Sequence, residues 1–467
     1  EEQSRYEVVP EKFIYPYQKD NSSKISLFRA SDENYPEYYN LNDDGYSTPP
    51  DYQGSLGICW AFAAASSMET YLLKNGLSNI KNPIKFSTRQ LDYASVHKDY
   101  ITEGFNPYSI AGRNYPGSGA RFNTAFLLMS SGISPVTTDK FADSLTDTGK
   151  KSISEVINLD NVEYTVDSYV NYGTLGDYNS QEERDSWIKE IKNHLFHYGS
   201  VAISVKGSSP YSAGSCIHVY EDKTNFLVNQ NGNCNESGDG GHAMAIIGYD
   251  DNYTYQYCRL DSTTTSDLTN CSNIVSGKGA FILKNSWGES YSYPYLAYTS
   301  NVNGSYGITG VSKKNWDINY DMTKENEGTY DSGLSQVTYY KSKKMEEKLK
   351  KISFYSVSAG EKEYQVFVQS NENSEYRLVG KVTTDKVGLN SLFVDDDISL
   401  DSDKFSIKIT SSDGYIDKIY AYTKESTNLE ELKVDTVIKN QKEYEMNDSE
   451  LSIYSVTNQV ANGGEVQ

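Results

Sequence analysis

The sequence lacks any run of about 18 consecutive apolar residues among its 467 positions, which excludes a helix that spans a membrane. It is also poor in positive charge: 43 Lys and Arg stand against 64 Asp and Glu, so the formal net charge is -21 at pH 7. A chain with this charge repels phosphate, which argues against nucleic-acid binding. The first ten residues, "EEQSRYEVVP", lack the pattern of a signal peptide, and we expect any export signal to have been removed.

Cysteine is equally scarce, and its spacing limits what the thiols can do. The five cysteines are Cys59, Cys216, Cys234, Cys258 and Cys271. An odd count in an exported protein leaves one thiol over. Pairing of sequence neighbours in polar, turn-rich stretches predicts the disulfides Cys216–Cys234 and Cys258–Cys271 and leaves Cys59 free. The alternative is five reduced thiols in a cytosolic protein.

The length and the 37% hydrophobic content suffice for two or three domains, and no internal repeat of fixed period is present. Residues 1–34 are polar and predict an N-terminal extension or the remnant of a pro-segment. Residues 35–312 predict an α+β domain, with helices expected at 59–75, 121–132 and 183–199 and strands at 200–205, 243–250 and 279–287. After a linker at 313–333, alternating runs such as "KKISFYSV" and "KFSIKIT" predict a β-sandwich-like domain over 334–467.

The stretch "QGSLGICWAF" (53–62) places Cys59 at the start of the first expected helix. The partial positive charge at a helix N-terminus is expected to lower the pKa of a thiol and favour the reactive thiolate. Gly54 and Gly57 leave room for a substrate backbone. Gln53 supplies a side-chain N–H that can stabilise an oxyanion.

A thiolate that attacks an acyl group needs a histidine as base and acid. Among five histidines, His242 is singled out by its glycine-rich approach to a buried strand, "GDGGHAMAIIGYD"; the alternative is a half-buried structural histidine. His194 and His197 lie on a polar helix and are expected to be solvent-exposed. In "LKNSWG" (283–288), Asn285 can accept from an imidazole N–H, and Trp287 can shield that bond from water.

Together these residues resemble the papain-like cysteine peptidases. The resemblance rests on "QGSLGICWAF", "FSTRQLDYAS", "GSGARFNTAFLLMSSGI", "GHAMAIIGYD" and "FILKNSWG", in that order along the chain. It implies a two-lobed α+β fold, with a helical left lobe and a β-barrel-like right lobe. It also implies the catalytic roles: Cys59 as nucleophile, His242 as base and acid, Asn285 as its orienting partner, and Gln53 with the Cys59 N–H as oxyanion hole.

The resemblance further implies how substrate binds. Gly119 would pair with the substrate backbone beside Gly57, and Ala243 with the neighbourhood of Arg121 would line the pocket for the second residue before the scissile bond. Trp287 would cover the histidine contact. No cofactor is required for this chemistry.

One departure from the family pattern concerns Leu56 and Ala94, which stand where the family has two bonded cysteines. Both ends of the bridge are missing together, so no orphan thiol results. Either a core contact replaces the bridge or nothing does.

The C-terminal region resembles the lectin-like domain that follows papain-like domains in clostridial surface-layer peptidases, on "NWDINYD" and "LKKISFYSVSAGEKEYQVFV". The acidic stretch 394–403, "VDDDISLDSD", predicts either a structural calcium site or a solvated acidic loop; the metal content of the chain stays open.

These observations favour a secreted or bacterial cell-surface cysteine endopeptidase that acts on proteins or peptides, with a cell-wall or surface-layer component as a candidate partner. The appended β domain would bind substrate, surface or sugar. Two alternatives stay open: an adhesin or binding protein on a catalytically spent papain fold, and a transferase of the transglutaminase type. The transferase usually carries Asp where this chain has Asn285.

Overall fold

The computed structural model describes residues 8–9, 35–96, 100–102, 115–176, 179–206, 226–227, 241–259, 264–265, 267–320, 335–341, 347–371, 373–400, 404–424, 436–439 and 442–445. Its α-helices are α1 (Cys59–Lys74), α2 (Thr88–Ala94), α3 (Thr124–Ser130), α4 (Ile153–Val156) and α5 (Gln181–His197). The N-terminal two thirds also hold the strands β1 (Val8–Val9), β2 (Tyr38–Asn40), β3 (Ala120–Arg121), β4 (Tyr164–Asn171), β5 (Val201–Lys206), β6 (Phe226–Leu227), β7 (Gly241–Arg259), β8 (Thr264–Thr265), β9 (Ile274–Lys284), β10 (Tyr295–Ala297), β11 (Gly304–Lys313) and β12 (Ile318–Tyr320). The C-terminal part consists of β13 (Ser335–Lys341), β14 (Glu347–Ser356), β15 (Lys362–Gln369), β16 (Arg377–Thr384), β17 (Gly388–Leu400), β18 (Lys404–Thr410), β19 (Ile416–Lys424), β20 (Thr436–Lys439) and β21 (Lys442–Glu445).

The three expected helices form where their end signals place them. Helix α1 is rich in alanine and ends just before Gly76, whose φ of +70° suits a helix stop. Helix α5 begins at a capping box in which Ser180 and Glu183 satisfy each other's backbone N–H groups. Helix α3 starts later than expected, at Thr124, because Ala120–Arg121 form the short strand β3.

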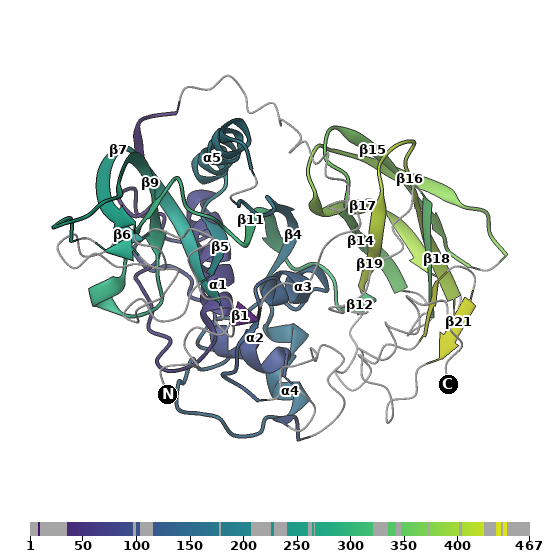
Figure 1. Cartoon of the computed structure of the whole chain (residues 1–467). Coiled ribbons are helices and arrows are strands. Elements are labelled where there is room, and N and C mark those ends of the chain that lie inside the picture. The colour runs from purple at the N-terminus through teal and green to yellow at the C-terminus, as the bar shows by residue number, and fades with distance from the viewer. Residues whose placement is uncertain are drawn as a thin grey trace.

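A long, mixed sheet runs through the molecule in the strand order β12-β19-β14-β17-β4-β11-β5-β7-β9-β10-β6. Helix α1 packs across β5, β7 and β11, and α5 lies against β5 and β7 (Figure 1). The α+β fold class is confirmed. Among the described strands, the path ends at β6 on one side, so the lobe expected to resemble a barrel is an open sheet.

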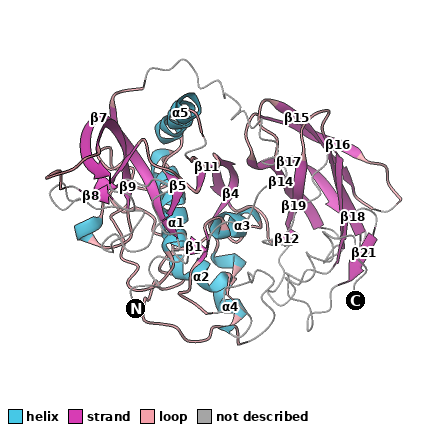
Figure 2. Cartoon of the chain, viewed as in Figure 1, coloured by secondary structure: helices cyan, strands magenta, loops and turns pink. Residues whose placement is uncertain are grey.

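The second sheet has the order β16-β15-β18-β13-β20-β21, and the described residues after Tyr320 form no helix (Figure 2). Its core is shared with β14, β17 and β19 of the long sheet, which confirms the expected sandwich-like packing. The alternating residues Tyr364, Val366 and Val368 of β15 point into this core, as their period of two requires.

The two parts of the chain share backbone pairing and a hydrophobic core. Strand β17 pairs with β4 through Gly388↔Val170 and Leu389↔Tyr169. One core cluster contains residues of α1 and α3 together with Trp316, Leu389 and Tyr422. Buried Trp316 and strand β12 fall inside the stretch expected to be a linker, and β12 pairs with β19. The domain boundaries themselves stay a prediction.

The expected exposure of His194 is wrong, because this side chain is fully buried. Its Nδ1 lies 2.9 Å from the Tyr172 hydroxyl. The ring fits because Gly307 on the neighbouring strand has no side chain: a Cβ there would come within 2.4 Å of it. His197, one helical turn later, is exposed as expected.

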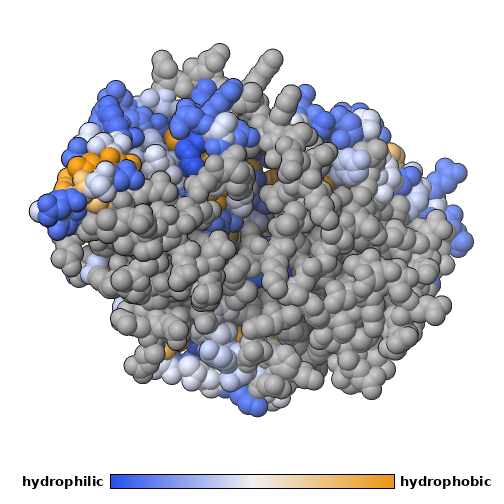
Figure 3. All heavy atoms as spheres, in the orientation of Figure 1, coloured by the Kyte–Doolittle hydropathy of each residue, from blue (hydrophilic) through white to orange (hydrophobic). Residues whose placement is uncertain are grey.

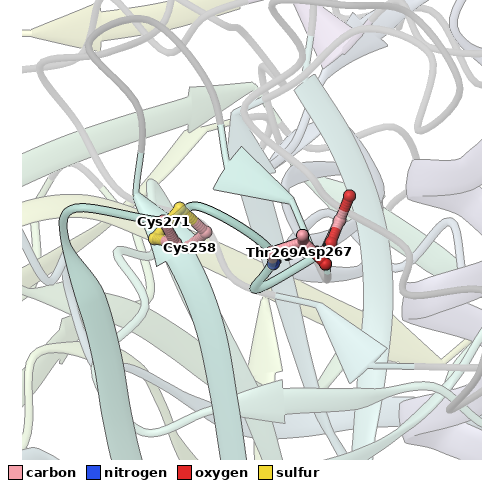
Figure 4. Close-up of a disulfide and its surroundings, with 4 residues drawn as sticks. All are labelled: Cys258, Asp267, Thr269 and Cys271. Atoms are coloured by element: carbon pink, nitrogen blue, oxygen red, sulfur yellow. Dashed lines mark hydrogen bonds between the residues drawn. A yellow bond between two sulfur atoms is a disulfide. The ribbon is translucent and has the colours of Figure 1, made fainter.

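The disulfide Cys258–Cys271 forms as predicted, with its Cα atoms 5.7 Å apart. It ties the end of β7 to a turn in which Asp267 accepts from the Thr269 N–H (Figure 4). The other predicted pair, Cys216 and Cys234, lies outside the described residues.

The surface over α5 is largely hydrophilic in the described part of the space-filling view (Figure 3). None of the helices described here is long and apolar enough to cross a membrane.

The contact between Gly132 and the C-terminal part leads to a stability prediction. Gly132 has φ +87°, and a Cβ there would lie 2.6 Å from the Trp316 ring and 3.0 Å from Tyr422. Gly360, at φ +80°, has nothing within 4 Å of its Cβ position. Both Gly→Ala changes should cost about 1–2 kcal/mol for the left-handed backbone, but Gly132→Ala should cost about 1–3 kcal/mol more through overpacking. Urea unfolding measures the difference; equal losses would contradict the packing described.

Candidate active site

Helix α1 presents Cys59 at its first position. The preceding residue, Ile58, makes no side-chain capping hydrogen bond, and the first turn contains no acidic residue. Nothing within that turn therefore opposes the positive end of the helix dipole near the thiol. Three backbone N–H groups act on the sulfur, those of Ala243, Trp60 and Cys59 itself, and each lowers the thiol pKa.

Burial outweighs these groups. Cys59 is fully buried, and loss of hydration raises the pKa of its thiol to about 12. The expectation of a lowered pKa is therefore wrong for the thiol in this closed arrangement. The reason is long-range: the helix start is shielded from water by segments distant in the sequence, which the local motif does not reveal.

His242 and Asn285 meet across the ends of two paired strands, β7 and β9. The imidazole Nε2 lies 2.8 Å from Asn285 Oδ1, and the Ser286 N–H donates to the same oxygen at 2.8 Å. Because that oxygen can only accept, Nε2 carries the proton and Nδ1 is the basic nitrogen of the neutral ring. The Ala243 N–H, next to His242, donates to Cys59 Sγ at 3.4 Å, which brings all three expected catalytic residues into one site.

Trp287 stacks on the imidazole, with ring centroids 4.3 Å apart and planes 24° from parallel. The indole thus covers one face of the His242 ring. His242 is fully buried, and this burial lowers its pKa to about 4, although the Asn285 hydrogen bond acts in the opposite direction. The buried site therefore favours a neutral Cys59 thiol and a neutral His242 imidazole.

Gln53 is buried and joined to the Asn285 loop. Its backbone N–H donates to the Ser286 carbonyl at 2.8 Å, and the Ser286 hydroxyl donates to Gln53 Oε1 at 2.6 Å. These contacts fix which end of the amide carries the N–H donors, and one donor reaches the Leu56 carbonyl at 2.6 Å. Ser286 was present in the "NSWG" motif, yet sequence reasoning did not assign it this role, because the contact spans both lobes.

The opposite wall of the site is built from Gly57 and the segment that leads into β3. The Gly57 N–H donates to the Gly117 carbonyl at 2.7 Å, and the Gly117 N–H donates to Asp92 Oδ2 at 2.8 Å. Asp92 also forms a buried ion pair with Arg89. Asp92 was missed, since "LDYAS" shows only a single acidic residue on a helix.

Leu56, at one end of the absent family disulfide, is half-buried and lies against Gly117. A Cβ on Gly117 would lie 2.7 Å from Leu56 Cδ2, so the leucine is pressed against this glycine. Ala94, the other end of the missing bridge, is buried in the core of α1 and α3. Replacement of the bridge by a core contact stays a prediction.

Gly119, Ala243 and Arg121 are all buried, and the Ala243 N–H contacts Cys59 Sγ. Gly119 directly precedes β3, whose residues Ala120 and Arg121 pair in parallel with Val8 and Val9 of β1. Val8 also pairs with Gly241, the residue before His242. An extended backbone thus fits between β3 and the start of β7. Their roles in substrate binding stay predictions.

The acidic stretch 394–403 belongs largely to β17, with Val394, Ile398 and Leu400 in the core. Within the described residues no group of three or more Asp, Glu, His or Cys side chains could hold a metal ion. The calcium expectation stays untested.

The chain was compared with known protein families and with curated sequences. The profile of the family described as "Papain family cysteine protease" matches residues 35–316. A comparison with curated protein sequences gave no match.

Two solved structures are similar over most of the chain. The clostridial cysteine protease Cwp84 after propeptide cleavage has a TM-score of 0.59 and 20% identity, over 87% of this chain and 94% of that one. The cysteine protease and lectin-like domains of Cwp84, a surface layer associated protein of Clostridium difficile, give a TM-score of 0.57 and 20% identity, over 88% and 85% of the two chains. At this identity the likeness shows the fold.

The lowered pKa of His242 predicts how stability depends on pH. Between about pH 6.5 and pH 4 the unfolded chain binds a proton on this residue and the folded chain does not. Stability is therefore lost as the pH falls through this window, by on the order of 3 kcal/mol from His242. In His242→Gln the loss should be smaller by that amount, since buried His194 titrates in the same direction in both proteins. Urea unfolding of both proteins at pH 7 and pH 4 tests this. An equal loss of unfolding free energy in the wild type and in His242→Gln would contradict it.

Proposed function

We propose, because the chain belongs to the papain family of cysteine proteases, that it is an endopeptidase in which Cys59 attacks a peptide carbonyl. The observation that carries the proposal is the joint placement of Cys59 Sγ, His242 and Asn285, from a helix start and two strand ends. This placement suits the expected roles of Cys59 as nucleophile, His242 as base and acid, and Asn285 as the orienting residue.

The reaction follows from the proton positions. His242 Nδ1 takes the thiol proton as Cys59 Sγ bonds to the carbonyl carbon. The tetrahedral intermediate collapses when the imidazolium returns the proton to the leaving amine and the C–N bond breaks. Water, deprotonated by the same nitrogen, then hydrolyses the thioester and frees the acid and the thiol.

The oxyanion would be stabilised by the Cys59 N–H and the Gln53 amide. The Ser286 hydroxyl holds Gln53 Oε1, so the NH₂ end points away from Ser286 and toward Leu56. Such preorganised donors gain strength in a dry site and need no rearrangement during the reaction.

Attack requires a charge separation that burial opposes. A substrate backbone that enters beside Cys59 replaces other covering groups, and the helix N-terminus and the three N–H groups then favour the thiolate. Asn285 stabilises the imidazolium through Nε2–H. The groups that favour ionisation of Cys59 are therefore present in this chain, and burial of the site opposes their effect on the thiol pKa.

The pairing of Val8 and Val9 supports a second element of the proposal, that residues 1–34 act as a pro-segment. These two residues bridge β3 and the residue before His242, where an extended substrate would lie. One similar structure is of a protease after propeptide cleavage. The segment would keep the site covered until it is removed.

The setting of the enzyme is part of the proposal. A disulfide favours an oxidising compartment, and a similar structure is a surface layer associated protein. We therefore assign the chain to secretion or the bacterial cell surface, with proteins there as substrates. The C-terminal β domain would bind substrate, surface or sugar; calcium in it is a further element of the proposal.

The catalytic assignment predicts selective labelling. An epoxysuccinyl thiol inhibitor, applied under reducing conditions, should modify Cys59, as mapped by mass spectrometry. Cys59→Ala should lose the adduct and reduce kcat for casein or a peptide by about 10⁴-fold or more. A Cys258→Ala/Cys271→Ala variant controls for label on reduced disulfide thiols.

The alternatives give other outcomes. Unlabelled Cys59 in well-folded protein from which residues 1–34 have been removed would favour a spent scaffold used for binding. Labelled Cys59 with amine incorporation in place of hydrolysis would favour a transferase.

The pro-segment assignment predicts activation by truncation. Removal of residues 1–34 should raise the rate of Cys59 labelling by about tenfold or more, because a covered site reacts only during the fraction of time it is open. A synthetic peptide of residues 1–34, added back, should slow the labelling again. Equal rates for the full and the shortened chain would refute this role.

A further inference from the structure

A cluster of four charged side chains and a threonine lies behind the catalytic residues. Lys284, Glu69 and Thr48 are buried, and Lys85 and Asp51 are partly exposed at its outer side. With two lysines and two carboxylates the cluster has no net charge. None of these groups enters the reaction described above.

The cluster is densely connected. Lys284 Nζ donates to Thr48 Oγ1 at 2.7 Å and lies 3.8 Å from Glu69 Oε2. The Thr48 hydroxyl donates to the same Glu69 oxygen. Lys85 Nζ bonds Asp51 at 2.6 Å and lies 3.7 Å from Glu69.

The backbone fixes Glu69 as well. The Phe86 N–H donates to its second carboxylate oxygen at 3.0 Å. Both oxygens of Glu69 are therefore bound, and the side chain has one defined position.

Three members of the cluster belong to segments that carry a catalytic group. Glu69 is on α1, ten residues after Cys59 on the same rigid helix. Lys284 is the last residue of β9 and directly precedes Asn285. Asp51 stands two residues before Gln53, and its carbonyl accepts from the Gly288 N–H at 3.2 Å.

We propose that Glu69 and Lys284 are positioning residues, which hold the end of β9 against α1 and so set His242 and Asn285 at working distance from Cys59. The inference rests on the proposed function. The Lys284–Glu69 contact links the nucleophile's helix to the strand of the orienting amide, by a route separate from the Ala243–Cys59 contact. Because the pair is buried, loss of one partner leaves the other charge uncompensated and the two elements must shift apart. Burial lowers the pKa of Lys284 and Glu69 acts in the opposite direction, which agrees with mutual dependence of the pair.

A second buried lysine provides a matched control. Lys351 pairs with Asp167 at 3.0 Å and is as deeply buried as Lys284. It joins β14 to β4, away from Cys59. Lys284→Met and Lys351→Met should both lower stability, but only Lys284→Met should alter the chemistry.

The test measures iodoacetamide alkylation of Cys59 from pH 4 to pH 9 in the full chain and in the chain without residues 1–34, beside peptide kcat and KM. Lys284→Met should lower the plateau alkylation rate and kcat by about tenfold or more, since a small misplacement of catalytic groups has effects of that size or larger. It should also shift the acidic limb of the profile and leave KM unchanged. Lys351→Met should keep the wild-type profile.

Thr48→Val keeps both charges and removes only the bridging hydroxyl, so it tests the proposal if Lys284→Met does not fold. It should change the profile in the same direction by a smaller factor. A wild-type profile in Thr48→Val, or the same shift in Lys351→Met, would overturn the positioning role. If the folded chain shows no Cys59 alkylation at any pH, with or without residues 1–34, the proposed function itself has failed.

Discussion

The structure depends on one constraint: the start of α1 must stay in fixed register with the first residues of β7. The Ala243 N–H donates to Cys59 Sγ, and His242 stands next to it in the sequence. The thiol and the imidazole come from elements far apart in the chain, so their approach is set by how α1 packs across β5, β7 and β11. A helix and a strand each carry one reacting group, and both are rigid enough to hold it within the tolerance that catalysis needs.

Burial gives this site two opposed tendencies. The same exclusion of water that strengthens the His242–Asn285 bond raises the thiol pKa and lowers the imidazole pKa. The covered enzyme is thus held in the neutral pair. The helix dipole and the N–H groups at the sulfur are present throughout, and they become effective when a bound substrate changes what surrounds Cys59. The groups that favour the thiolate and the burial that opposes it therefore act on the same sulfur.

Local structure was predictable from the sequence, and long-range burial was not. The bounds of α1 agree within one residue, because alanines and Gly76 determine them locally. His242 and Asn285 were found through their strand contexts. The exposure of His194 was misjudged because the space for its ring is left by Gly307, which is distant in the sequence although close in the fold. In "METYLLK" and "FILKNSWG", nothing local distinguishes Glu69 and Lys284 from solvent-exposed charged residues. Their burial depends on the fold, which brings them together.

The C-terminal β domain is continuous with the catalytic sheet, and this affects how it acts. Strand β4 would be an exposed sheet edge without β17, and exposed edges invite pairing with other chains. Pairing is reinforced by Trp316 and Tyr422 in the common core and by the buried Lys351–Asp167 ion pair. Such an interface is costly to separate, because it would leave a buried charge unpaired on each side. The C-terminal β domain is therefore better regarded as a fixed part of one folded unit than as a tethered module.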